Sequence, residues 1–130
     1  MLEILLYIVL AVVGFFVFMQ IFVRLSGFFK RGKEIGNIRG ELGRRIQTGR
    51  KLLVYFYSPS CGACRPMTPV IDTMKKESGN VFSVNLAKDM QTARAFGVMG
   101  TPATVIVEEG RIRKFILGAR TERYLRDLIR

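Results

Sequence analysis

The only two cysteines of this 130-residue chain, Cys61 and Cys64, stand three positions apart. A thiol pair at this spacing suits thiol–disulfide exchange, in which one thiolate attacks a disulfide sulfur and a second thiol releases the product. The chain has no histidine, and two thiols alone cannot supply the four ligands of a tetrahedral zinc site. The cysteine count also excludes a disulfide-rich secreted scaffold.

The surroundings of this pair favour a redox role over an incidental one. A strongly apolar strand is predicted over Leu52–Ser58, and a helix is predicted from Cys61 to Glu77. The unpaired N–H groups and the positive dipole end of such a helix favour a thiolate at its first residue. We therefore expect Cys61 to be the nucleophile and Cys64, one turn along, to be the resolving thiol. The small residues between them, Gly62 and Ala63, leave Cys61 accessible.

The rest of the domain must position this pair. Two further helices are predicted at Asp89–Phe96 and Arg120–Ile129, and the further strands are expected at Val81–Leu86, Ala103–Val107 and Ile112–Leu117. A right-handed crossover joins the two parallel strands, and the Glu109-Gly110 turn adds an antiparallel hairpin. The pattern predicts an α/β domain with a mixed four-stranded sheet flanked by helices.

The predicted domain carries, in this order, Cys-Gly-Ala-Cys at 61–64, Pro69, Gly100-Thr101-Pro102 and Gly118. With these features, residues 52–129 resemble the thioredoxin superfamily. The Cys-Gly-Ala-Cys sequence at 61–64 matches its active-site motif, and Pro69 matches the proline that bends its active-site helix. Gly100-Thr101-Pro102 matches the loop that carries a cis proline, and Gly118 matches the glycine before the final helix.

The resemblance implies a thioredoxin-like fold and a substrate-binding role for two residues. The Thr101–Pro102 bond is expected to be cis, beside the cysteine pair. The backbone of Thr101 is expected to pair with an extended substrate segment next to Cys61.

Departures from the family pattern concern proton transfer. Ser60 and Ala63 replace the usual Trp and Pro. Tyr55 stands where the family buries an acidic residue, and Ser83 stands where its partner lysine would fall. The proton relay is therefore absent or replaced by water, and a strongly reducing enzyme of thioredoxin type is not implied. Tyr55 itself is interpreted as a core residue.

An apolar segment precedes the domain. Ile4–Val23 contains no charged residue and is long enough to cross a bilayer as a helix. A cleavable signal peptide is disfavoured because the chain starts Met-Leu-Glu and the apolar run is too long. We predict a transmembrane anchor at 1–25 and a basic juxtamembrane linker and helix at 26–51, with the bilayer exit at Ser26–Gly32. The thioredoxin-like domain is predicted at 52–130.

Basic residues cluster just after the apolar segment. None precedes it, whereas residues 24–51 carry Arg24, Lys30, Arg31, Lys33, Arg39, Arg44, Arg45, Arg50 and Lys51. The positive-inside rule then places the domain in the cytoplasm, with an extracytoplasmic domain as the alternative. These charges suit anionic lipid headgroups, so nucleic acid is not an expected partner. The domain's own surplus of +5, from 12 basic and 7 acidic residues, favours acidic partners.

Within the basic segment, Ile35, Ile38, Leu42 and Ile46 recur at helical spacing and predict one apolar helix face. This face is expected to pack on the domain core, or alternatively to lie on the membrane. The helix is expected to end at Thr48-Gly49.

The sequence thus predicts a single-pass, membrane-tethered thiol–disulfide oxidoreductase, acting as a protein disulfide reductase rather than an oxidase. Its expected partners are protein substrates with disulfides or thiols, the lipid bilayer and an upstream electron donor or acceptor. No metal or organic cofactor is expected, because the cysteines carry the electrons. Two alternatives stay open: a binding or assembly module for a membrane complex, and a dithiol carrier of a soft metal such as Cu(I).

Overall fold

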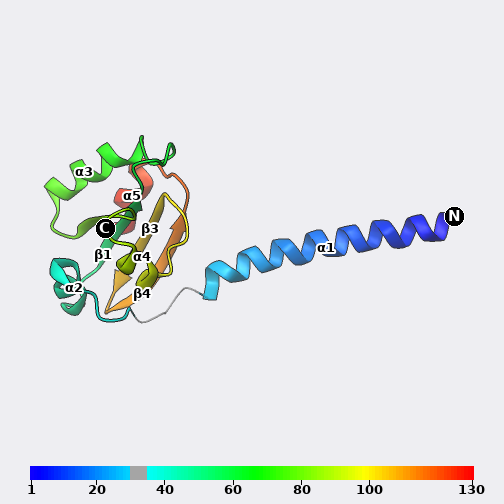
Figure 1. The fold of residues 1–130 in the computed structure, drawn as a ribbon, viewed down its shortest axis with the longest axis horizontal. Coiled ribbons are helices and arrows are strands. Elements are labelled where there is room, and N and C mark those ends of the chain that lie inside the picture. Colours follow the sequence, from blue (N-terminus) through cyan, green and yellow to red (C-terminus); the bar gives the residue numbers. More distant parts are fainter. Residues whose placement is uncertain (30–34) are drawn as a thin grey trace. The chain divides into compact units, whose positions relative to one another are not determined.

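The computed structural model in Figure 1 describes residues 1–29 and 35–130. It contains two compact units, Met1–Lys30 and Arg31–Arg130. The first unit is a single helix, α1 (Leu2–Phe29). Within α1, Leu2–Phe22 is long and apolar enough to cross a membrane, and none of this stretch is buried against protein. The helix continues through the predicted bilayer exit as far as Phe29, and the rest of that exit lies outside the described residues.

A mixed four-stranded sheet forms the centre of the second unit. Its strands are β1 (Leu52–Tyr57), β2 (Val81–Asn85), β3 (Ala103–Glu108) and β4 (Arg111–Leu117), in the spatial order β2-β1-β3-β4. β1 runs parallel to β2 and antiparallel to β3, and β3 and β4 form the hairpin. The predicted α/β fold with a mixed sheet is confirmed.

Helices cover both faces of this sheet. They are α2 (Gly40–Gln47), α3 (Met67–Glu77), α4 (Met90–Phe96) and α5 (Glu122–Ile129). α3 and α5 pack on one face, whereas α2 and α4 pack on the other (Figure 1). Leu53 and Tyr55 of β1 point to the first face, and Val54 and Phe56 point to the second. Because both faces are covered, β1 reads as a continuous apolar run rather than as an alternating one.

The helix predicted from Ile35 begins five residues later, at Gly40. Gly40 has a φ of +85°, which lies outside the right-handed helical region and prevents the helix from extending back to Ile35. The expected packing on the core is confirmed, because Ile38 and Ile46 are buried there. α2 ends with Thr48 as its C-cap, as predicted.

Candidate active site

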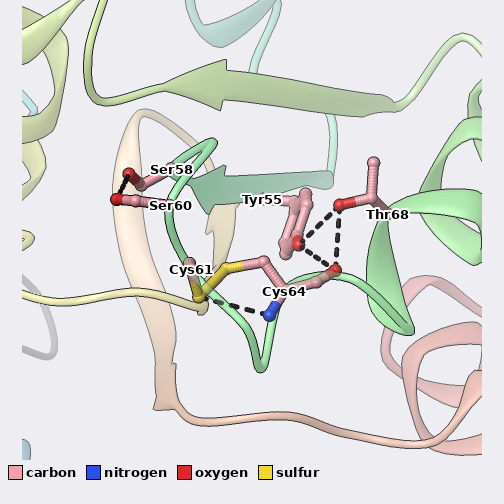
Figure 2. Close-up of a disulfide and its surroundings, with 6 residues drawn as sticks. All are labelled: Tyr55, Ser58, Ser60, Cys61, Cys64 and Thr68. Atoms are coloured by element: carbon pink, nitrogen blue, oxygen red, sulfur yellow. Dashed lines mark hydrogen bonds between the residues drawn. A yellow bond between two sulfur atoms is a disulfide. The ribbon is translucent and has the colours of Figure 1, made fainter.

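Cys61 and Cys64 form a disulfide in the turn between β1 and α3, with their Cα atoms 5.3 Å apart (Figure 2). The turn leaves β1 through a hydrogen bond in which the Cys61 N–H donates to the Ser58 carbonyl at 3.1 Å. The two cysteines are therefore bonded to each other just after a buried strand, where the sequence predicts the pair.

The helix after this turn begins later than predicted, at Met67 rather than at Cys61. Pro66 has no N–H to donate to the Gly62 carbonyl, and a proline disfavours the helical conformation in the residue before it. Residues 62–66 instead form turns, with the Arg65 N–H donating to Gly62 and the Met67 N–H to Cys64. The first helical hydrogen bond runs from the Thr68 N–H to the Cys64 carbonyl at 2.9 Å.

The two sulfurs differ in access to solvent. Cys61 is partly buried, and Cys64 is only 2% exposed. Gly62 and Ala63 are both exposed, as expected for a tight turn with small side chains. The Cys64 N–H donates to the Cys61 sulfur at 3.2 Å, so a hydrogen-bond donor faces that sulfur from within the turn. A donor in this position stabilises negative charge on Cys61 when the disulfide is open.

The cis-proline loop lies at the same end of the sheet. The Thr101–Pro102 bond is cis, as the family resemblance implied. Ala103 pairs with Phe56 across the strands, so Pro102 stands where β1 leads into the cysteine turn. Pro102 is buried and Thr101 is partly exposed, and the Gly118 N–H donates to the Pro102 carbonyl at 2.8 Å.

Tyr55 has a polar role that sequence analysis missed. Its side chain is fully buried under the cysteine turn, yet its hydroxyl donates to the Cys64 carbonyl at 3.3 Å. The same hydroxyl lies 3.2 Å from the hydroxyl of Thr68, which in turn donates to the Cys64 carbonyl at 2.9 Å (Figure 2). Burial raises the pKa of Tyr55 above 10.0, against a smaller lowering effect of the hydrogen bond with Thr68.

The sequence carried one signal for this contact. Thr68 follows Cys64 by four residues, so the predicted helix from Cys61 would place both on the same face. A polar residue there needs a buried partner, and Tyr55 supplies it.

No group of three or more His, Cys, Asp or Glu side chains that could hold a metal ion occurs among residues 1–29 and 35–130. The groups that the structure shows at the site are the two sulfurs and the hydrogen-bond donors around them.

Comparison with known proteins identifies the family. A family model described as "Thioredoxin" matches residues 39–130, so the chain belongs to the thioredoxin family. Together with the Cys61–Cys64 disulfide, this membership indicates thiol–disulfide oxidoreductase chemistry. The match includes α2, which lies in the segment predicted as a basic juxtamembrane linker and helix.

Similar proteins come from several organisms. Thioredoxin from Bacillus subtilis is 25% identical over 81 residues, which is 60% of this chain and 78% of that protein. Chloroplastic thioredoxin M4 from Arabidopsis thaliana is 31% identical over 77 residues, 57% of this chain and 40% of that protein. Among solved structures, the X-ray structure of Fasciola hepatica thioredoxin is similar, with a TM-score of 0.58 and 26% identity. That alignment covers 68% of this chain and 86% of the other.

Proposed function

We propose that this chain is a membrane-tethered protein disulfide reductase in which Cys61 is the nucleophile and Cys64 the resolving thiol. The observation that carries the proposal is the unequal exposure of the two cysteines: Cys61 is partly exposed, whereas Cys64 is 2% exposed. A bulky substrate disulfide can approach the first sulfur and not the second. Only the internal attack by Cys64 then remains for releasing the substrate.

The exchange takes place in two balanced steps. The Cys61 thiolate attacks one sulfur of a substrate disulfide, which forms a mixed disulfide and releases the other substrate sulfur as a thiolate. Cys64 then gives up its proton and attacks the Cys61 sulfur. The Cys61–Cys64 bond forms, the bond to the substrate breaks, and the released substrate thiolate takes up a proton. Two electrons pass from the protein dithiol to the substrate, and an upstream donor returns them.

Thr101 and Pro102 serve as the substrate-binding edge in this proposal. Pro102 precedes β3 at the end of the sheet that carries the cysteine turn. An extended substrate segment beside Thr101 would place its disulfide next to Cys61. No cofactor is required, because the cysteine pair holds the electrons.

The tether and the direction of exchange rest on α1 and on the charges that follow it. α1 is long and apolar enough to span a bilayer, and the chain carries nine basic residues between 24 and 51. By the positive-inside rule the domain faces the cytoplasm. In that reducing compartment the pair is kept as a dithiol and acts as a reductant.

A trapping experiment tests the assignment of the two cysteines. Cys64→Ser leaves Cys61 able to attack and removes the group that resolves the mixed disulfide. We expect discrete high-mass adducts on non-reducing gels of membranes from cells that make this variant. The adducts should collapse on reduction, and their protein component identifies the substrate.

Cys61→Ser is the matched control, and it should give no adducts. Adducts of equal yield in both variants would contradict the assignment of Cys61 as the nucleophile. If neither folded, membrane-inserted variant gave adducts, the exchange function itself would be rejected in favour of an assembly module.

A further inference from the structure

We infer that the buried hydroxyl of Tyr55 and the partly buried hydroxyl of Thr68 together keep Cys64 in reach of Cys61 while the disulfide is open. The inference rests on the proposed exchange function and assigns two further residues to its second step. It follows from the hydrogen bonds around one atom, the carbonyl oxygen of Cys64.

The Cys64 carbonyl is the point at which the cysteine turn is fixed to the rest of the domain. It accepts hydrogen bonds from the Thr68 N–H at 2.9 Å and from the Met67 N–H at 3.1 Å, both at the start of α3. It also accepts from the Thr68 hydroxyl at 2.9 Å and the Tyr55 hydroxyl at 3.3 Å. Of these donors, only Tyr55 belongs to the sheet, so its hydroxyl links the turn to β1 (Figure 2).

In the cysteine turn, besides the hydrogen bonds to the Cys64 carbonyl, the Cys61 N–H donates to the Ser58 carbonyl and the Cys64 N–H donates to the Cys61 sulfur. Residues 62–66 lack regular helix, and the Arg65 N–H bond to Gly62 joins two exposed residues at 3.3 Å. The Cys61–Cys64 bond is itself a constraint on this segment, and reduction removes it. The hydrogen bonds to the Cys64 carbonyl remain in place, because they do not involve a sulfur atom.

Tyr55 suits a donor role and not that of a base. Its side chain is fully buried beside Cys64, Met67 and Ile71. A buried phenol stays neutral at physiological pH and keeps its proton for donation. Its hydroxyl is bonded to the Cys64 backbone and not to either sulfur, so it acts through the position of Cys64.

The consequence concerns the second step of exchange alone. The attack by Cys61 on a substrate needs only an accessible thiolate. The attack by Cys64 on the mixed disulfide needs a short, aligned approach between two sulfurs of the same turn, and such geometry is a large part of an intramolecular rate. Loss of the Tyr55 hydroxyl should therefore slow resolution and leave the first attack unchanged.

The test separates the two steps with one reagent, the small aromatic disulfide 5,5′-dithiobis(2-nitrobenzoate). The reduced full chain in detergent releases one thionitrobenzoate when Cys61 attacks and a second when Cys64 resolves the mixed disulfide. For Tyr55→Phe we expect an unchanged first phase and a second phase slowed by about three- to tenfold, the range expected for one net hydrogen bond.

Tyr57→Phe is the matched control. Tyr57 lies on the same strand with its ring stacked on Tyr55, at 5.7 Å between centroids, and its hydroxyl makes no hydrogen bond among the described residues. Both phases should match the wild type.

A second pair of variants tests the hydroxyl of Thr68 on α3. Thr68→Val removes this hydroxyl and should also slow the second phase. Thr68→Ser keeps a hydroxyl and should resolve the mixed disulfide at the wild-type rate.

The outcomes distinguish this inference from the proposed function. A wild-type chain that releases no second thionitrobenzoate would reject exchange through the cysteine pair altogether. A wild-type chain that resolves normally, with Tyr55→Phe and Thr68→Val resolving equally fast, would overturn the positioning role alone. Equal slowing of both phases, or slowing by Tyr57→Phe, would also overturn it, since a general loss of structure affects both steps.

Discussion

At the scale of single residues, the sequence indicates that Gly43 weakens a helix, whereas the structure shows that the fold requires it. A glycine inside a helix lowers helix propensity, and Gly43 stands in the middle of α2. In the structure it is buried, and a Cβ atom added there would overlap the carbonyl group of Ile38. The glycine is therefore needed for the close approach of α2 to the Ile38 backbone in the preceding non-helical segment.

Replacement of Gly43 by Ala should destabilise the domain despite the better helix propensity of alanine. The added methyl group forces the Ile38 backbone away from its place, which typically costs about 1–3 kcal/mol. We expect a lower urea midpoint for the detergent-solubilised chain, followed by tyrosine fluorescence. Gly36→Ala is the control, because nothing lies within 4 Å of a Cβ there and its effect should stay within about 0.5 kcal/mol. Equal stability of the two variants would contradict the argument.

At the scale of elements, an ion pair between side chains joins α3 to α5. Arg126 of α5 makes a two-pronged ion pair with Glu77 at the last turn of α3, at 2.5 and 3.4 Å. It also bonds to Glu122 within its own helix at 2.8 Å. The guanidinium of Arg126 lowers the pKa of Glu77 below 4.5 and has its own pKa raised in return. α3 and α5, which pack on the same face of the sheet, are thus joined at the end of α3 that lies away from the cysteines.

This ion pair predicts a pH dependence of stability. Because the pKa of Glu77 is lowered on folding, its contribution is complete above pH 4.5 and is lost as the pH falls through the lowered pKa. Glu77→Gln should therefore lower the melting temperature at pH 7 and lose this effect in acid. The difference should be small and should shrink with added salt, since both side chains are substantially exposed.

Asp72→Asn, on the same helix, is the control for that series. The described part of the chain shows no ion pair for Asp72, so its melting temperature should follow the wild type at both pH values. A Glu77→Gln effect of the same size at pH 7 and in acid would count against the ion pair as its cause.

At the scale of the whole molecule, the chain combines an apolar helix with a basic domain. Residues 24–130 carry all 21 basic side chains and nine of the ten acidic ones, whereas Glu3 is the only charged side chain before Arg24. A bilayer-spanning α1 would leave this charge on one side of the membrane. Under the positive-inside rule, this charge favours the proposed placement of the domain in the cytoplasm.

Labelling of the cysteines tests this orientation. After brief reduction, a membrane-impermeant maleimide should fail to modify the chain in intact cells and should modify it once the cells are permeabilised. Cys61 is the reporter, because it is partly exposed whereas Cys64 is 2% exposed. Cys61→Ser should remove most of the label. Full modification in intact cells would place the domain outside, and release of the chain by an alkaline wash would reject the transmembrane anchor.

Sequence patterns predicted the mixed sheet and the cysteine pair because both depend on strong local signals. The apolar run of β1 and the turn at Glu109-Gly110 needed no knowledge of distant contacts. The predicted start of α3, at Cys61, was wrong because Pro66 lacks the N–H of one helical hydrogen bond. The spacing of apolar residues does not show such a loss. The spacing of Cys64 and Thr68 indicates a shared helix face, but it does not identify Tyr55 as the partner. The Tyr55 hydroxyl meets residues nine and thirteen positions away only once β1 and α3 are packed.

The presence of a single cysteine pair has a consequence for stoichiometry. The chain holds one exchangeable pair of electrons, and closing the Cys61–Cys64 bond leaves no second dithiol in reserve. In the proposed reductase, each molecule must therefore receive two electrons from a donor before it can reduce a second substrate disulfide.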